Sequence, residues 1–153
     1  MPPLVDEVDR RLLEVLRHDG RVSINELARR TNVSRATAYA RVARLVADQV
    51  IVGFSAEVDA RALGYEISAL ILVGIEQHLW SEARRKFRSI PGVEYIALTS
   101  GDFDVLLVVR AADLATLRDV VLVELQSMKE VRQTRTVFIL DEERRPLPVE
   151  HEP

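Results

Sequence analysis

The sequence predicts an α+β chain with an N-terminal three-helix winged helix-turn-helix unit and a C-terminal βαββαβ unit of the ferredoxin-like type. Apolar residues recur at helical spacing through the first third of the chain, whereas strand-like and helical segments alternate after Tyr65. Between them, residues 50–59 are β-prone and predict an extended hinge strand. We therefore divide the chain into a helix-turn-helix domain (1–50), a hinge strand and linker (51–63), a second domain (64–141) and a charged tail (142–153) that we expect to be mobile.

Each helix of the first unit has its own sequence signal. Apolar residues at helical spacing predict a first helix over residues 6–18. Ser23 and Glu26 have the spacing of a capping box, which predicts a second helix directly after the serine. Asn32 tolerates the left-handed backbone of a sharp turn, and Ser34 is a good cap for a third helix. The pattern predicts two short helices around a tight turn.

The third helix has an apolar and a polar side. Its core-facing stripe consists of Ala38, Val42, Leu45 and Val46. The outer face and its edges carry Arg35, Thr37, Tyr39, Arg41 and Arg44. Helix-turn-helix proteins lay this helix in the major groove, so the pattern predicts double-stranded DNA as a partner. The alternative interpretation is a solvated helix face, on which apolar and charged residues also alternate.

The distribution of charge favours DNA binding. Residues 21–44 contain six arginines and a single acid, Glu26, a balance of +5, whereas the formal net charge of the whole chain is −3. We expect base-edge contacts from Arg35, Thr37 and Tyr39 beside the capping Ser34, and phosphate contacts from Arg21, Arg41 and Arg44. For Arg41, internal support of the helix is the alternative.

The second unit is predicted to contain six elements in the order βαββαβ. They are strands over 66–76, 93–100, 103–110 and 131–140 and helices over 80–89 and 113–128, with a turn at Gly101 and Asp102. This order is that of a four-stranded antiparallel sheet with both helices on one face.

Two predicted strands are apolar on both faces. Residues 67–75 contain one polar side chain, Ser68, and residues 105–109 contain none. An antiparallel sheet covered by helices on one face normally alternates, because its other face meets water. The pattern therefore predicts a homodimer in which a second copy covers that face. Two DNA-reading helices in such a dimer predict a palindromic operator.

The composition excludes several functional classes. The absence of cysteine excludes disulfides, thiolate zinc sites and cysteine nucleophiles. No apolar run approaches the ~20 residues of a membrane helix, and the N-terminus lacks the regions of a signal peptide, so we expect a cytoplasmic protein without a membrane partner. We assign no metal ligand and no catalytic residue, because His18, His78 and His151 are scattered along the chain.

Motifs in both units resemble those of the Lrp/AsnC (leucine-responsive, or feast/famine) transcriptional regulators over nearly the whole chain. They are D-x-x-D-R-x-L-L (6–13), E-L-A (26–28), N-V-S (32–34), R-V-A-R-L (41–45), V-I-V-G-F (50–54), I-P-G-V (90–93) and S-G-D-F-D-V (100–105). Gln49 departs from the family pattern, in which glycine usually ends the reading helix. A left-handed cap at this residue costs roughly 1 kcal/mol, so we expect the helix to end differently.

The resemblance implies a C-terminal regulation-of-amino-acid-metabolism (RAM) domain that dimerises through its sheet, often assembles further into octamers and binds a small effector, usually an amino acid, without a cofactor. The effector site then maps onto Thr99, Ser100, Gly101, Asp102, Phe103 and Asp104, with Thr134 and Thr136 as neighbours. Turn N–H groups can take a carboxylate, and Asp102 or Asp104 can hold an ammonium group. An ordinary hairpin turn is the alternative.

Two other functions remain open at this point. An architectural DNA organiser with low sequence preference uses the same arginines, because phosphate contacts supply affinity without sequence information. A siroheme-decarboxylase-like enzyme resembles the family as well, with Asp102 and Asp104 as acid and base. We expect a sequence-specific regulator that responds to an amino acid and is not an enzyme.

Overall fold

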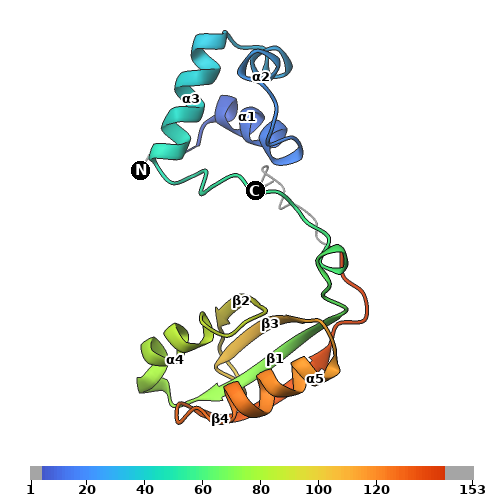
Figure 1. Cartoon of the computed structure of the whole chain (residues 1–153). Helices are drawn as coiled ribbons and strands as arrows, with labels where there is room; N and C mark the ends of the chain where they lie inside the picture. The colour runs from blue at the N-terminus through green and yellow to red at the C-terminus, as the bar shows by residue number, and fades with distance from the viewer. Residues whose placement is uncertain (1–4, 144–153) are drawn as a thin grey trace. The chain divides into compact units, whose positions relative to one another are not determined.

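The chain folds into two compact units. The computed structural model describes residues 5–143, and these divide into one unit up to Glu57 and a second unit over Val58–Glu143 (Figure 1). The division falls inside the predicted linker. The predicted tail lies outside the described residues from residue 144 onward.

The first unit is a three-helix bundle. Its helices are α1 (Glu7–His18), α2 (Ile24–Thr31) and α3 (Arg35–Ala47) (Figure 1). They pack around four buried side chains, namely Leu12, Leu27, Ala28 and Ala38. The partly buried apolar residues that enclose this core come from all three helices and the turns: Val8, Val15, Leu16, Val22, Ile24, Val33 and Val42. The predicted helical stripes are confirmed except at Val46, which is 42% exposed.

The N-terminal caps of α1 and α2 differ in how many backbone N–H groups they satisfy. At α1, Asp6 accepts from the Asp9 N–H group at 2.9 Å, and Asp9 accepts from the Asp6 N–H group at 3.1 Å, which makes a complete capping box. At α2, Ser23 accepts from the Glu26 N–H group at 3.2 Å. The reciprocal half predicted for Glu26 is not formed, because its carboxylate binds Arg29 instead.

The turn and the end of α3 both use left-handed backbone at non-glycine residues. Asn32, with φ 55° and ψ 48°, joins α2 to α3 as predicted. Gln49 has φ 58°, so the expectation that α3 ends differently is wrong. The Gln49 N–H group donates to Val46 O at 3.1 Å and the Val50 N–H group donates to Leu45 O at 2.9 Å, the two bonds of a Schellman motif. These two bonds complete the Schellman motif at the end of α3, although left-handed backbone is unfavourable for a non-glycine residue such as Gln49.

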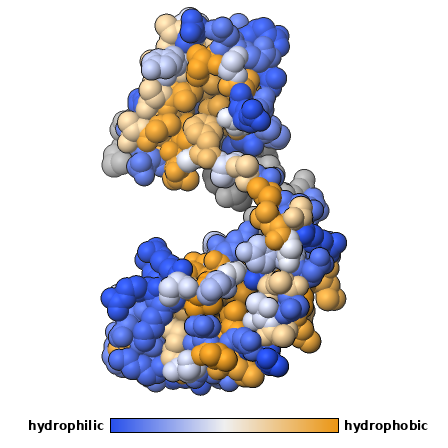
Figure 2. Space-filling model, in the orientation of Figure 1, coloured by the Kyte–Doolittle hydropathy of each residue, from blue (hydrophilic) through white to orange (hydrophobic). Residues whose placement is uncertain are grey.

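The predicted hinge strand is wrong. Residues 50–59 form no β-strand, and the described part of the first unit therefore has no wing strand. The residue types favour an extended backbone, but a strand also needs a neighbouring strand for its N–H and C=O groups. Val52, Phe54 and Val58 remain exposed along this segment. Figure 2 shows hydrophobic side chains reaching the surface here and on both units.

The second unit is built on one antiparallel four-stranded sheet. Its strands are β1 (Ile67–Ile75), β2 (Val93–Leu98), β3 (Val105–Ala111) and β4 (Val131–Phe138), in the spatial order β2-β3-β1-β4. The connections contain short 3₁₀ turns (Arg61–Leu63 and Gln77–Leu79) and the helices α4 (Trp80–Phe87) and α5 (Leu114–Asp119) (Figure 1). The predicted βαββαβ order and the α+β class are confirmed.

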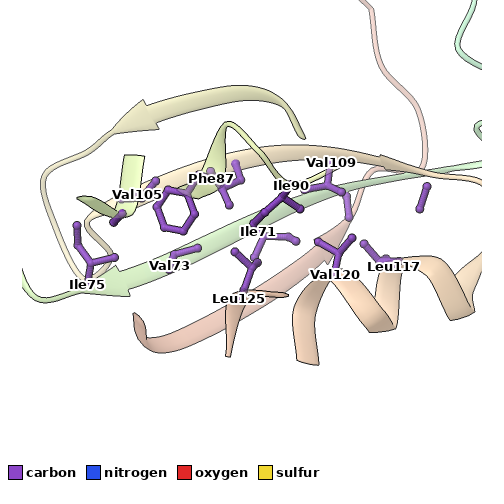
Figure 3. Packing of buried hydrophobic residues seen from close by; sticks show 14 residues of the cluster. Ile71, Val73, Ile75, Phe87, Ile90, Val105, Val109, Leu117, Val120 and Leu125 are labelled. Carbon is purple, nitrogen blue, oxygen red and sulfur yellow. The ribbon is translucent and has the colours of Figure 1, made fainter. Parts of the chain in front are cut away.

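The core lies between the sheet and its two helices. Alternate residues of the central strands, such as Ile71 and Leu107, point toward the helices and are fully buried. Phe87 of α4 and Leu117 of α5 pack against the same face, as the side chains in Figure 3 show. Both helices therefore cover one face of the sheet.

The other face of the sheet is apolar and has no helix over it in the described chain. Opposite residues of an antiparallel pair point to the same face, so the register places the intervening residues together on this side. They include Leu70, Leu72, Ala97, Leu106, Val108 and Val137. Tyr95 and Val137 are 57% and 44% exposed, and we call these seven residues the open sheet face.

The predicted last helix is interrupted. In place of one helix over residues 113–128, α5 ends at Asp119 and a π-helical segment follows over Val120–Leu125. The Gln126 N–H group bonds to Val121 O at 3.0 Å, the wider i→i+5 spacing of a π-helix. The wider turn keeps Val120 and Leu125 buried in the core. A periodicity of 3.6 residues does not anticipate this change.

Replacing Gln49 by glycine should stabilise the first unit by about 0.5 to 1 kcal/mol. Glycine removes the ~1–2 kcal/mol cost of left-handed backbone, and its larger loss of conformational freedom on folding returns part of this gain. Urea unfolding followed by helical circular dichroism measures the change.

Asp48→Gly is the matched control, because Asp48 has φ −79° and no strain to relieve. This variant should be less stable than the parent chain. A Gln49→Gly variant that is also less stable would contradict the account of the helix end.

Candidate functional site

Helix α3 presents a narrow polar face that begins at its N-terminus. Ser34 accepts from the Thr37 N–H group at 3.0 Å, and the two hydroxyl oxygens lie 2.8 Å apart. Ala38 and Leu45 are fully buried and fix the inner side of the helix. Arg35 is exposed, and the Tyr39 side chain one turn later is 67% exposed. The geometry leaves the first turns of α3 open to a partner.

Arg41 and Arg44 lie away from that open face. Arg41 Nη1 donates to Asp9 at 3.1 Å and also bonds to Asp6, and Arg44 Nη2 bonds to Asp9. The hydrogen bond from Arg41 lowers the pKa of Asp6 to about 2. Arg41 thus makes the internal contacts expected for the alternative role, and its predicted phosphate contact stays a prediction. Arg44, only 44% exposed, has the same carboxylate partner.

Folding neutralises much of the positive charge counted in residues 21–44. Glu26 binds Arg29 at 2.6 Å and Arg30 at 2.9 Å, and these hydrogen bonds lower the pKa of Glu26 to about 2. With Arg41 and Arg44 paired to α1, four of the six arginines have acidic partners. Arg21 and Arg35 have no ion pair with any residue between 5 and 143.

The predicted effector turn is a short, open loop between β2 and β3. The Thr99 N–H group donates to Asp104 O at 2.8 Å, and the Thr99 hydroxyl donates to Phe103 O at 2.7 Å. Gly101 has φ 128°, a backbone conformation that favours glycine, and a Cβ atom there would meet nothing within 4 Å. The space above Gly101 is therefore free for a ligand.

The two acids of the turn have different surroundings. Asp104 Oδ2 accepts from the Ile75 N–H group at 2.8 Å and from Arg132 Nη2 at 3.2 Å, so this carboxylate fastens the turn to the end of β1. Asp102 is exposed and has no hydrogen bond or ion pair within the described chain. Of the two, Asp102 is the acid available to an external ammonium group.

The register of β4 separates Thr134 and Thr136 from the turn. They lie opposite Val73 and Ile71, whose side chains face the helices, and Thr134 accepts a hydrogen bond from Gln126 at 3.1 Å. Arg135 points to the opposite side, and its guanidinium lies 5.2 Å from the centre of the Phe103 ring. Sequence reasoning missed Arg135. Strand alternation predicts that it points away from its two neighbours, but the sequence does not say which side meets the turn.

Two other kinds of site are not found in the part of the chain that the structure describes. Within it, no group of three histidine, aspartate or glutamate side chains is arranged to hold a metal ion. None of its helices combines the length and the apolar character required to cross a membrane.

A helix-turn-helix unit joined to a βαββαβ unit defines a DNA-binding regulator with a separate ligand-binding domain. The model of the AsnC-type helix-turn-helix domain matches residues 5–46, and that of the Lrp/AsnC ligand-binding domain matches residues 68–147. The chain belongs to the Lrp/AsnC family of transcriptional regulators.

Other proteins are similar to this chain over most of its length. An HTH-type transcriptional regulator of Pyrococcus horikoshii is 34% identical over 135 residues, which cover 88% of this chain and 85% of that protein. The fold matches that of E. coli AsnC with a TM-score of 0.86 at 24% identity, over 95% of this chain and 99% of the other. The feast or famine regulatory protein of M. tuberculosis, complexed with L-methionine, is 30% identical with a TM-score of 0.83, over 90% and 92%.

Proposed function

We propose that this transcriptional regulator reads a palindromic double-stranded operator as a homodimer and that an amino acid controls its assembly or DNA affinity. The observation that carries the DNA-binding part is the open face of α3. Arg35 and Tyr39 are exposed one turn apart on the same side of the helix, whereas Thr37, about 200° around the helix from each, is half-buried beside the capping serine. Arginine is a good partner for guanine in the major groove, and hydroxyl groups bond to several bases. Arg21 supplies a phosphate contact from outside α3.

The open sheet face supports the homodimer. Its leucine and valine side chains form a contiguous apolar surface on the two central strands and their neighbours. A second copy of the same sheet has the matching surface, and packing the two about a two-fold axis removes both from water. A two-fold axis also duplicates α3, so the operator has two related half-sites.

An α-amino acid fits the chemistry of the turn. The relative from M. tuberculosis is described in complex with L-methionine. In this chain the turn at residues 99–104 lies within the segment that matches the ligand-binding domain of the same family. Arg135 and the backbone N–H groups of the turn at Gly101 can donate to a carboxylate, and exposed Asp102 can accept from an ammonium group. Such an effector acts by binding one assembly more tightly than another.

The remaining parts of the proposal follow from the regulator class. The family points to a regulator and not to an enzyme, and in this proposal the protein needs no cofactor besides its effector. A DNA partner favours a cytoplasmic location. An architectural organiser is the second candidate, because phosphate contacts of Arg21 and Arg35 supply affinity without sequence information.

Replacing Arg35 by alanine should weaken binding to a duplex selected by the parent protein from a random pool. The expected loss is about 1 to 3 kcal/mol, with relaxed preference at one base position, because a base contact is removed. Fluorescence anisotropy with the selected and a random duplex measures both quantities.

Arg11→Ala is the matched control, because Arg11 lies on α1 and pairs there with exposed Glu7. This variant should keep the parent preference. Unchanged preference in Arg35→Ala would reject the role of Arg35, and a parent protein without preference for any duplex would favour the architectural organiser.

An amino acid that binds the turn should raise the melting temperature of the parent protein, and Arg135→Gln should abolish this shift. Binding stabilises the folded state by RT ln(1 + [L]/Kd), so even a weak effector is visible at millimolar concentration. Thermal shift with each of the common amino acids at about 10 mM tests the two proteins side by side.

Thr136→Val is the matched control, because Thr136 neighbours Arg135 in sequence but lies on the helix-covered face. It should keep the thermal shift. A parent protein that responds to no amino acid would contradict the effector proposal, whereas an equal response in Arg135→Gln would reject only the role of Arg135.

A further inference from the structure

The first unit has one fully buried acidic side chain among its described residues. Asp9, in the first turn of α1, has a side chain that is only 1% exposed. The groups that face its carboxylate are the Asp6 N–H group at 3.1 Å, Arg41 Nη1 at 3.1 Å, Arg44 Nη2 and the Asp6 carboxylate, which shares Arg41 Nη1. An isolated buried carboxylate is strongly unfavourable, so the donors among these groups are required for its charge.

The carboxylate of Asp9 holds α3 at two points. Arg41 and Arg44 are three residues apart and therefore lie on the same side of the helix. At about 100° per residue, Arg41 is about 200° around the helix from Tyr39, so the side held by Asp9 is opposite the side that is open. Two attachments on one side restrict the rotation of α3 about its own axis. This rotation decides where Arg35 and Tyr39 point.

The ion pairs with Asp9 also offset the positive charges of Arg41 and Arg44. Burial disfavours the charged form of Asp9, but hydrogen bonds from Arg44, the Asp6 backbone and Arg41 outweigh this effect and hold the pKa of Asp9 below its ordinary value. Asp9 is thus a charged partner at neutral pH. A guanidinium whose charge is paired with a buried carboxylate attracts a phosphate less strongly than an unpaired one does.

We propose that Asp9 is a positioning residue for DNA reading, which sets the orientation of α3 and withholds Arg41 and Arg44 from the phosphate backbone. The inference rests on the proposed DNA-binding function. It separates two groups of arginines that the sequence does not distinguish: Arg35 reads DNA, and Arg41 and Arg44 hold the helix that carries Arg35 in place.

The variant Asp9→Asn in the full chain tests this inference, because it keeps the shape of the side chain and removes its charge. Binding is measured to the duplex selected by the parent protein and to a random duplex over a series of salt concentrations. Glu7→Gln is the matched control: it makes the same charge change in the same helical turn, but Glu7 is 84% exposed and, among the described residues, forms its ion pair with Arg11.

The expected result for Asp9→Asn has two parts. Affinity for the selected duplex falls by about tenfold or more, because the base contacts are misplaced. Affinity for the random duplex is kept or rises, and its dependence on salt steepens by up to about 1, because Arg44 is released and adds about 0.9 when it binds a phosphate, whereas Arg41 keeps its bond to Asp6. Glu7→Gln leaves the ratio of the two affinities unchanged.

Other results overturn the inference. Equal losses for both duplexes with an unchanged salt dependence show that Asp9 serves only the stability of the unit, and unchanged binding to both shows that α3 is positioned without it. If the parent protein itself shows no preference between duplexes, it is the proposed sequence-specific function that fails.

Arg44→Gln provides an independent test if circular dichroism shows that Asp9→Asn does not fold, because Asp9 then keeps Arg41 as its partner. A lower ratio of selected to random affinity with an unchanged salt dependence supports the positioning role. A salt dependence shallower by about 0.9, with both affinities reduced together, shows that Arg44 contacts a phosphate and overturns the inference.

Discussion

The organisation of this protein depends on a sheet whose central strands are apolar on both faces but covered by helices on only one. Side chains such as Ile71 and Leu107 build the core with α4 and α5, and the residues between them, such as Leu72 and Leu106, leave an equally apolar surface open. Hydrophobic burial favours covering this surface, and the same sheet in a second copy fits it. In the proposed dimer α3 is duplicated, and one helix–DNA contact becomes two linked contacts.

Within the first unit, folding pairs many of the arginines of the helix-turn-helix segment with acidic side chains. A balance of +5 over residues 21–44 suggests a uniformly basic surface. In the folded unit, acids from α1 and α2 pair with most of these arginines, and the unpaired positive charge is concentrated at Arg21 and Arg35. A regulator gains from this arrangement, because fewer free cations mean less affinity for random DNA and a larger share of specific contacts.

Local features of the sequence predicted most of the fold, and tertiary pairings account for what they missed. The turn at Asn32 and the cap at Ser34 depend on neighbouring residues, so the sequence predicted them correctly. Asp9 and Arg41 are 32 residues apart, and no local pattern reports their contact. Residues 50–59 are β-prone, but a strand exists only where another strand pairs with it. Near the effector turn, the alternation of side chains along a strand predicts that Arg135 points to the opposite face from Thr134 and Thr136. Only the register of β4 in the folded sheet shows that Arg135 is the residue that contacts Phe103.

The oligomeric state in solution tests the central claim most directly, because the open sheet face either requires a second copy or does not. Sedimentation equilibrium of the full chain, from nanomolar to micromolar concentration and without DNA or effector, gives the mass of the particle. The account predicts a dimer, with twice the chain mass of 17.3 kDa, or an assembly of such dimers. A monomer at micromolar concentration would contradict it, because an apolar surface of this kind would then remain in water.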